Sequence, residues 1–246
     1  MSIRWADEKR CTRITVQLIQ GGGIVQQAIK KKKSIECKSG ATDLVTESDQ
    51  AVEKLLISGF SNAFPDHKFI GEESVAAGEK CQLTSAPTWI IDPIDGTMNF
   101  VHSLPYVCIS IALWVNKEPE IAVVYNPCLE QMFTARKGKG AFLNGEKINV
   151  SGQKELNQAL VFAEMGTSLD PAKVDCVLTN VTTLMPKVHG IRAMGSCAMN
   201  LVTVASGGVD VCYEFGIHAW DTAAGYLIVR EAGGVVLDTD AVRFDL

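Results

Sequence analysis

The sequence has no excess of basic residues. Its 246 residues include 23 lysines and arginines against 28 aspartates and glutamates, and the formal net charge is −5. Proteins that bind nucleic acids normally carry a basic balance, because contacts to phosphates dominate their affinity. We therefore expect no nucleic-acid partner.

The sequence also lacks an apolar run long enough to span a membrane. Its first ten residues, M-S-I-R-W-A-D-E-K-R, contain no apolar core of a signal peptide. The eight cysteines are scattered, and no two of them form a C-x-x-C metal or redox pair. These absences fit a cytoplasmic protein with reduced thiols and no membrane partner.

Apolar periodicity, by contrast, extends over most of the chain. With 47% hydrophobic residues the chain can bury a sizeable core, as one large domain or two closely packed ones. Residues 106–150 alternate with period two between glycines, which predicts antiparallel hairpins. The K-G-K-G stretch at 137–140 lacks the G-K-[ST] of a phosphate loop, so we interpret it as a turn.

The remaining segments favour an alternation of helices and strands. Three glycines at 21–23 should loosen the middle of the first helix. We expect helices over 3–29, from Thr46 or Ser48 to Ala63, over 171–184, over 196–205 and from Trp220 to Gly233, and strands over 69–71, 188–191 and 209–215.

The densest group of possible ligands lies in W-I-I-D-P-I-D-G-T-M-N-F-V-H, residues 89–102. We expect its apolar start to form a buried strand that ends in a proline turn and delivers Asp92 to its exposed end. Because Pro93 has a fixed φ, the Ile94 carbonyl and the carboxylates of Asp92 and Asp95 can turn toward one point. Hard oxygen ligands of this kind suit Mg²⁺.

Gly96 and Thr97 follow the two aspartates and open a short helical stretch. Unpaired amides at a helix start can receive a phosphate beside such a metal. D-P-x-D-G is also ordinary turn chemistry, and a strand followed by such residues usually means no more than a turn. The stretch by itself therefore leaves a magnesium-dependent phosphate site and a plain turn both open.

Two further acidic positions precede this stretch. Asp49 falls in the first turn of the helix expected after Thr46, where it either complements the helix dipole or faces the metal site at longer range. Glu72 and Glu73 end a short apolar strand, and only one of them can point at a given ion unless the strand has ended. Either glutamate can equally be an ordinary exposed residue.

The C-terminal part carries another group of polar residues. Glu214 ends a strand and Asp221 lies in the first turn of the next helix, at the kind of place where an α/β protein builds its site. His218 between them is interpreted as a hydrogen-bonded structural histidine rather than a base. Near the other end, Lys38 precedes a polar turn that leads into an acidic segment.

Three motifs in this order resemble the inositol monophosphatase family: G-E-E-S at 71–74, W-I-I-D-P-I-D-G-T-x-N-F at 89–100 and W-D-x-A-A-G at 220–225. The similarity covers nearly the whole chain. It implies an α/β layered fold, an αβαβα sandwich, in a single domain over residues 1–246. Residues 1–150 would form the metal-binding half with an antiparallel sheet, and residues 151–246 a smaller substrate-side half.

The resemblance also implies roles for individual residues. Glu72, Asp92 and the Ile94 carbonyl would hold one Mg²⁺, Asp92, Asp95 and Asp221 a second, and Glu72 a weaker third. Glu72 and Thr97, the latter backed by Asp49, would orient and deprotonate the attacking water. Substrate contacts are implied for Asp95, Gly96, Thr97, Thr167, Ser196, Cys197, Glu214 and Asp221, with Lys38, Glu73 and His218 farther out.

The implied activity is Mg²⁺-dependent hydrolysis of myo-inositol monophosphates to inositol and phosphate. It would belong to a lithium-sensitive cytoplasmic homodimer in inositol metabolism and phosphatidylinositol signalling. One alternative is a phosphatase of another small phosphate ester, such as a sugar phosphate or an adenosine bisphosphate.

The other alternative is a non-catalytic shortened isoform, since family members normally continue beyond Leu246 through another strand and a helix. We expect the loss of that packing to lower stability.

Overall fold

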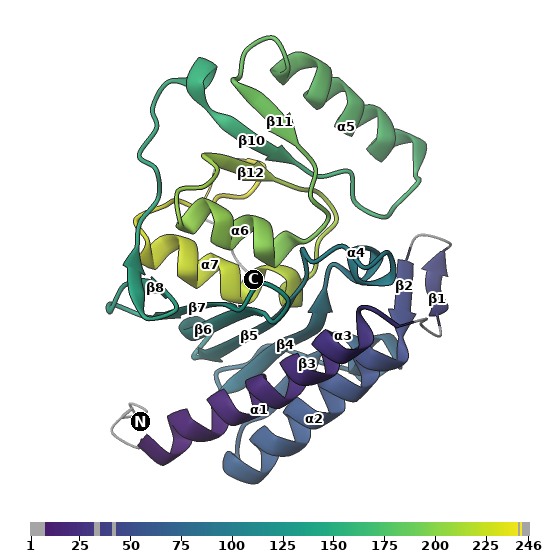
Figure 1. Cartoon of the computed structure of the whole chain (residues 1–246), viewed down its shortest axis with the longest axis vertical. Coiled ribbons are helices and arrows are strands. Elements are labelled where there is room, and N and C mark those ends of the chain that lie inside the picture. Colours follow the sequence, from purple (N-terminus) through teal and green to yellow (C-terminus); the bar gives the residue numbers. More distant parts are fainter. Residues whose placement is uncertain (1–7, 32–34, 41–42, 241, 243–246) are drawn as a thin grey trace.

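Helices and sheets stack in alternating layers (Figure 1). The computed structural model describes residues 8–31, 35–40, 43–240 and 242, with side chains over 17–31, 46–240 and 242. Within that part, two helices lie beneath a large sheet, two lie above it, and a smaller sheet and one more helix follow. The predicted layered fold is therefore confirmed. The helices are α1 (Glu8–Ala28), α2 (Glu47–Ala63), α3 (Glu72–Ala76), α4 (Thr97–Val101), α5 (Pro171–Leu184), α6 (Cys197–Ala205) and α7 (Ala219–Glu231).

The large sheet supplies the core of the molecule. Its strand order is β3-β4-β5-β6-β7-β8-β9, with β3 parallel to β4 and the later neighbours antiparallel. The period-two hairpins are confirmed, and K-G-K-G is the turn between β7 and β8. The strands are β3 (Lys68–Gly71), β4 (Thr88–Asp95), β5 (Cys108–Val115), β6 (Glu118–Asn126), β7 (Gln131–Arg136), β8 (Ala141–Leu143) and β9 (Glu146–Ile148).

The N-terminal helices α1 and α2 cover one face of this sheet. α1 is continuous through its three glycines, which we expected to loosen it. A Cβ on Gly21 would lie 3.2 Å from Ile109 Cδ1, and one on Gly22 would lie 2.6 Å from Tyr125 Cε1. The glycines therefore let the helix approach β5 and β6 closely.

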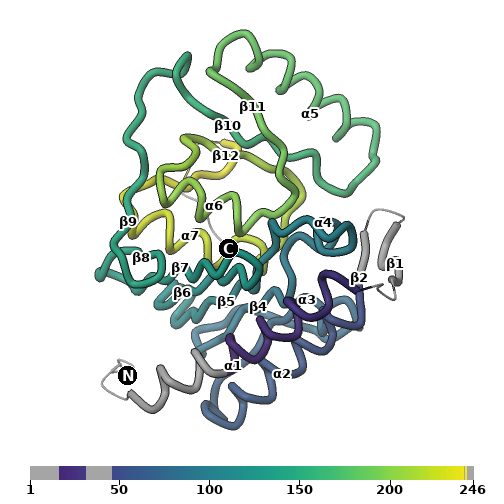
Figure 2. The backbone as a smooth tube through the Cα atoms, in the orientation of Figure 1, coloured from purple at the N-terminus to yellow at the C-terminus, as the bar shows by residue number. Residues whose placement is uncertain are grey.

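The helices α6 and α7 cover the opposite face of the same sheet, so helices from the N-terminal and C-terminal parts of the chain enclose it (Figure 2). Beyond them lies a three-stranded parallel sheet in the order β11-β10-β12, with α5 outside it. Its strands follow the predicted alternation and are β10 (Leu160–Ala163), β11 (Gly190–Arg192) and β12 (Val211–Tyr213).

β4 departs from the prediction at Pro93. We expected the apolar strand to end there in a turn, but β4 continues to Asp95. Its register with β5 shifts between Asp92 and Asp95, so Pro93 lies in an irregular part of the strand, where proline costs no regular ladder bond. A strand irregularity, rather than a turn, therefore sets the directions of the two carboxylates.

Smaller elements complete the fold. β1 (Ile35–Gly40) and β2 (Asp43–Thr46) form an antiparallel ribbon that leads directly into α2, and η1 (Leu156–Gln158) is a short 3₁₀ turn. Among the residues that the structure describes, no helix is both long and apolar enough to cross a membrane.

Candidate metal centre and active site

Three aspartates converge where β4 ends and α7 begins. One carboxylate oxygen from each of Asp92, Asp95 and Asp221 lies within 4.8 Å of the others. Asp92 and Asp95 are 2% and 6% exposed, and Asp221 is partly exposed. The tertiary structure thus joins two motifs that lie more than 120 residues apart in the sequence.

Asp221 is held by the capping of α7. It occupies the third position of the helix, and its Oδ2 accepts a hydrogen bond of 2.6 Å from the His218 backbone N–H. The His218 ring is exposed and stacks on the Trp220 ring at a centroid distance of 4.8 Å. The backbone of His218 thus helps to hold Asp221, and the interpretation of its ring as a hydrogen-bonded structural group stays a prediction.

The convergence makes negative charge unfavourable. Burial, followed by repulsion from Glu72, Asp95 and Asp221, raises the pKa of Asp92 well above its usual value. Burial likewise raises the pKa of Asp95 to about 6 and that of Asp221 well above its usual range. Several hard oxygen ligands that repel each other are the donor set that a divalent cation such as Mg²⁺ would neutralise.

Glu72 belongs to the same group. β3 ends at Gly71 and α3 begins at Glu72. Glu72 and Glu73 are therefore not in a strand, and their side chains need not point to opposite faces. The Glu72 carboxyl is in hydrogen-bonding contact with Asp92, and its charge raises the pKa of Asp92. Glu73 is half-buried beside it, and its more distant role stays a prediction.

The structure brings Asp49 and Thr97 into contact, and their roles at the site stay predictions. The Thr97 hydroxyl lies 3.3 Å from Asp49 Oδ1 and 3.2 Å from the Ile94 carbonyl oxygen. Asp49 is fully buried, and its Oδ2 accepts hydrogen bonds from the backbone N–H and the hydroxyl of Thr46, the N-cap of α2. Burial raises the pKa of Asp49 to about 6 despite these hydrogen bonds.

The segment before α6 closes the site from the other half of the chain. The Ser196 hydroxyl and the Ala198 N–H both donate to Asp95 Oδ2, the latter at 2.7 Å. Gly96 has φ 91°, and a Cβ there would lie 3.1 Å from the Ser196 Cβ. Glycine is thus required at position 96 both by its backbone conformation and by the closeness of this segment.

Glu214 lies beside Cys197, the first residue of α6. Its Oε2 is buried and has no hydrogen-bond partner among the described residues. Burial, then the charges of Asp95 and Glu164, raise the pKa of Glu214 to about 7, whereas a hydrogen bond with Cys197 and the charge of Lys173 lower it. A buried carboxylate with an unused oxygen is suited to accept a hydroxyl group.

Two predicted residues are not brought to this group by the described contacts. Thr167 is exposed in the loop after β10. Lys38 lies in β1, and its side chain is outside the described part of the chain. The substrate contact of Thr167 and the outer position of Lys38 remain predictions.

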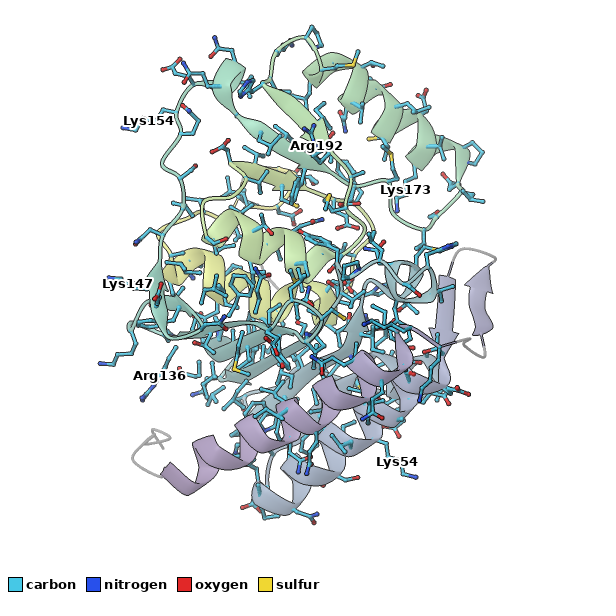
Figure 3. The ribbon with its side chains drawn as sticks, in the orientation of Figure 1. Lys54, Arg136, Lys147, Lys154, Lys173 and Arg192 are labelled. Atoms are coloured by element: carbon cyan, nitrogen blue, oxygen red, sulfur yellow. The ribbon has the colours of Figure 1, made fainter. Side chains whose placement is uncertain are left out.

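Three residues next to the site were missed by the sequence reasoning. Glu164 accepts hydrogen bonds from the N–H groups of Met194 and Gly195 at 2.6 and 3.0 Å and so holds the segment before α6. Lys173 reaches from α5 toward the loops below it (Figure 3). Of the three, only Glu53 could have been found from the sequence, because a charged residue stands there on the apolar stripe of α2, one helical turn after Asp49.

Comparison with known proteins gives the same family in the family model and in individual relatives. The model of the family described as "Inositol monophosphatase family" matches residues 7–246. Inositol monophosphatase 1 of Homo sapiens is 53% identical over 229 residues, which are 92% of this chain and 82% of that protein. Inositol monophosphatase 2 of Homo sapiens is 47% identical over 240 residues, which are 97% of this chain and 83% of that protein.

Solved structures show the same similarity. The IMPase of Thermotoga maritima has a TM-score of 0.84 and 33% identity, covering 96% of this chain and 88% of that one. The extragenic suppressor protein suhB from Bartonella henselae has a TM-score of 0.84 and 30% identity, covering 94% of this chain and 88% of that one.

Proposed function

Because the chain belongs to the inositol monophosphatase family, we propose that it hydrolyses myo-inositol monophosphates at the Asp92–Asp95–Asp221 group. The chain is a phosphatase of the hydrolase class. The convergence of three aspartate oxygens within 4.8 Å is the observation that carries the choice of site.

We assign the cation as Mg²⁺, in two or three sites. Glu72, Asp92 and the Ile94 carbonyl would hold one ion, Asp92, Asp95 and Asp221 a second, and Glu72 a third. All these donors are hard oxygens, and the raised pKa values of Asp92, Asp95 and Asp221 support a need for positive charge among them. When bound, such ions stabilise charge on the attacking and leaving oxygens of an in-line displacement.

The remaining residues then act on water and substrate. The Thr97 hydroxyl, which lies beside Asp49, would orient a water molecule, and Glu72 would take the proton from it. The amides of Gly96 and Thr97 would hold the phosphate. Water is the nucleophile in this scheme, so no phosphorylated enzyme is formed.

The alcohol part of the substrate would lie on the Glu214 side. The unused Oε2 of Glu214 supports a hydrogen bond from an inositol hydroxyl. Ser196 and Cys197 contribute the wall next to it, and Ser196 does so while its hydroxyl is bonded to Asp95. Asp95 and Asp221 would also contact the substrate, and Thr167 would reach it from the loop after β10.

Several finer features rest on the family resemblance, and each has a direct measurement. A homodimer would give twice the chain mass of 26.6 kDa in light scattering. Lithium inhibition would appear in the activity assay, and a cytoplasmic location in cell fractionation. The single domain would melt in one transition. A role in inositol recycling and phosphatidylinositol signalling would follow from the substrate.

The function is tested by phosphate release from inositol 1-phosphate, with and without Mg²⁺. We expect release that requires Mg²⁺, because the cation neutralises the acidic group and activates water there. Asp92→Asn should lower the rate at least 100-fold, on the order of what loss of a key electrostatic group costs. The same change at exposed Asp175 of α5 is the control and should leave the rate unchanged.

No release by folded protein would contradict the proposal. Faster release from a sugar phosphate or an adenosine bisphosphate in the same assay would support the proposed phosphatase reaction but contradict inositol monophosphate as the preferred substrate.

A further inference from the structure

Glu53 is a buried carboxylate that is bonded to the start of α3. It lies on α2, is 4% exposed, and accepts three hydrogen bonds from two neighbouring residues. The backbone N–H groups of Glu73 and Ser74 donate to it at 2.7 and 2.8 Å, and the Ser74 hydroxyl donates at 2.6 Å. Gly71, the N-cap of α3, has no side chain for this purpose, so Glu53 caps the helix from another element.

Gly71 is what lets Glu53 come so close. A Cβ at Gly71 would lie 2.5 Å from Glu53 Cδ and 2.6 Å from its Oε2. The φ of Gly71 is −114°, which any residue adopts, so space rather than backbone conformation requires glycine here. Glu53 and Gly71 therefore act as one contact, and either partner can be changed to break it.

The position of Glu53 on α2 relates this contact to that of Asp49. Glu53 lies one turn after Asp49, and both carboxylates are buried. Asp49 takes part in the N-terminal capping of α2 through Thr46, whereas a second acid four residues later adds like-charge repulsion, so helix stability does not explain Glu53. Each carboxylate instead holds a different element: Asp49 lies beside the Thr97 hydroxyl, and Glu53 binds the residues directly after Glu72.

We propose that Glu53 is a positioning residue for Glu72, and that α2 thereby places both Thr97 and Glu72 against the metal and the attacking water. Glu53 acts through the backbone of α3 and does not itself touch the metal. The inference rests on the proposed role of Glu72 as a ligand. Groups that orient metal ligands typically change metal affinity or activity by about 10–100-fold when they are removed.

Direct metal binding tests this role. Calorimetric titration with Mg²⁺ would be made on the unchanged protein and on Glu53→Ala, Glu53→Gln, Gly71→Ala and Asp92→Asn. Glu231→Ala is the matched control, because Glu231 is a carboxylate that accepts N–H bonds of 2.7 Å from Gly138 and Gly140 at the far end of α7. Melting temperatures in EDTA and the kcat of every variant would accompany the titrations.

We expect Glu53→Ala and Gly71→Ala to weaken Mg²⁺ binding at least tenfold and to lower kcat. Glu53→Gln keeps one acceptor oxygen of the same shape and should fall between them and the unchanged protein. Glu231→Ala should lower the melting temperature without changing Mg²⁺ affinity. If Glu53→Ala fails to fold, Glu53→Gln and Gly71→Ala carry the same test.

Unchanged Mg²⁺ affinity in Glu53→Gln and Gly71→Ala, together with a lowered melting temperature, would overturn the inference and leave Glu53 a structural residue. This result differs from a failure of the proposed function. In that case the unchanged protein would bind Mg²⁺ and Asp92→Asn would not, yet no phosphate would be released.

Discussion

Glu214 shows how its surroundings set the chemistry of a single side chain. Burial and nearby acids raise its pKa to about 7, and the ammonium of Lys173 opposes them. Lys173 reaches this place between two glycines, since a Cβ on Gly166 or Gly216 would lie 2.3 or 3.3 Å from its Nζ. A cation in the first turn of α5 is unfavourable for the helix dipole, so the position serves the loops and not the helix.

Replacing Lys173 should therefore raise the pKa of Glu214. In metal-free protein we expect Lys173→Met to move the Glu214 titration above pH 7, because only the opposing positive charge is removed. Carboxyl ¹³C NMR follows this titration, and Glu214→Gln identifies the signal. Lys154→Met, at an exposed position, is the control. An unmoved Glu214 signal in Lys173→Met would contradict the assignment.

At the scale of elements, glycines decide how closely helices pack. A Cβ on Gly225 of α7 would lie 2.4 Å from Leu201 Cδ1 of α6, whereas a Cβ on Gly23 of α1 would meet no described atom within 4 Å. The same residue type therefore has opposite consequences in the two helices. α7 carries Asp221, so its close fit to α6 also bears on the site.

Alanine at these two positions should change stability in opposite directions. We expect Gly225→Ala to lower the free energy of unfolding by about 1–3 kcal/mol through overpacking. Gly23→Ala should raise it by about 0.5–1 kcal/mol, because alanine is the better helix former. Urea unfolding of both variants measures this. An unchanged free energy of unfolding in Gly225→Ala would mean that α6 and α7 can move apart without loss of stability.

At the scale of the whole molecule, the raised pKa values of the buried acids make stability depend on pH. The pKa values of Asp49 and Asp95 are raised to about 6, and those of Asp92 and Asp221 also rise, chiefly by burial. The folded state therefore binds more protons than the unfolded state between about pH 4 and 7. By linkage, stability decreases as pH rises through this range.

Metal-free protein should accordingly melt at a higher temperature near pH 5 than near pH 8. Each pKa unit corresponds to about 1.4 kcal/mol, so the rises of the Asp49 and Asp95 pKa values to about 6 together correspond to several kcal/mol. Saturating Mg²⁺ should remove most of this dependence, because it replaces the protons. Calorimetry in EDTA and in Mg²⁺ measures both curves. A metal-free melting temperature that rises toward pH 8 would show that burial and repulsion do not disfavour the ionised acids in the folded protein.

The sequence by itself determined most of the elements and the identity of the acidic residues. The bounds of α5 and the hairpins from β5 onward follow from periodicity, which acts within a few residues, and the sequence narrowed the N-cap of α2 to Thr46 or Ser48. The motifs at 71–74, 89–100 and 220–225 likewise named Glu72, Asp92, Asp95 and Asp221 through the family that they resemble.

Only the tertiary structure decided how these residues are held. β4 continues past Pro93 because pairing with β5 overrides the local preference for a turn. Ser196 bonds to Asp95 across 101 residues, and Glu53 reaches the start of α3 across about 20. Local periodicity contains no information about which distant backbone groups a buried carboxylate will meet, since packing of whole elements brings them together.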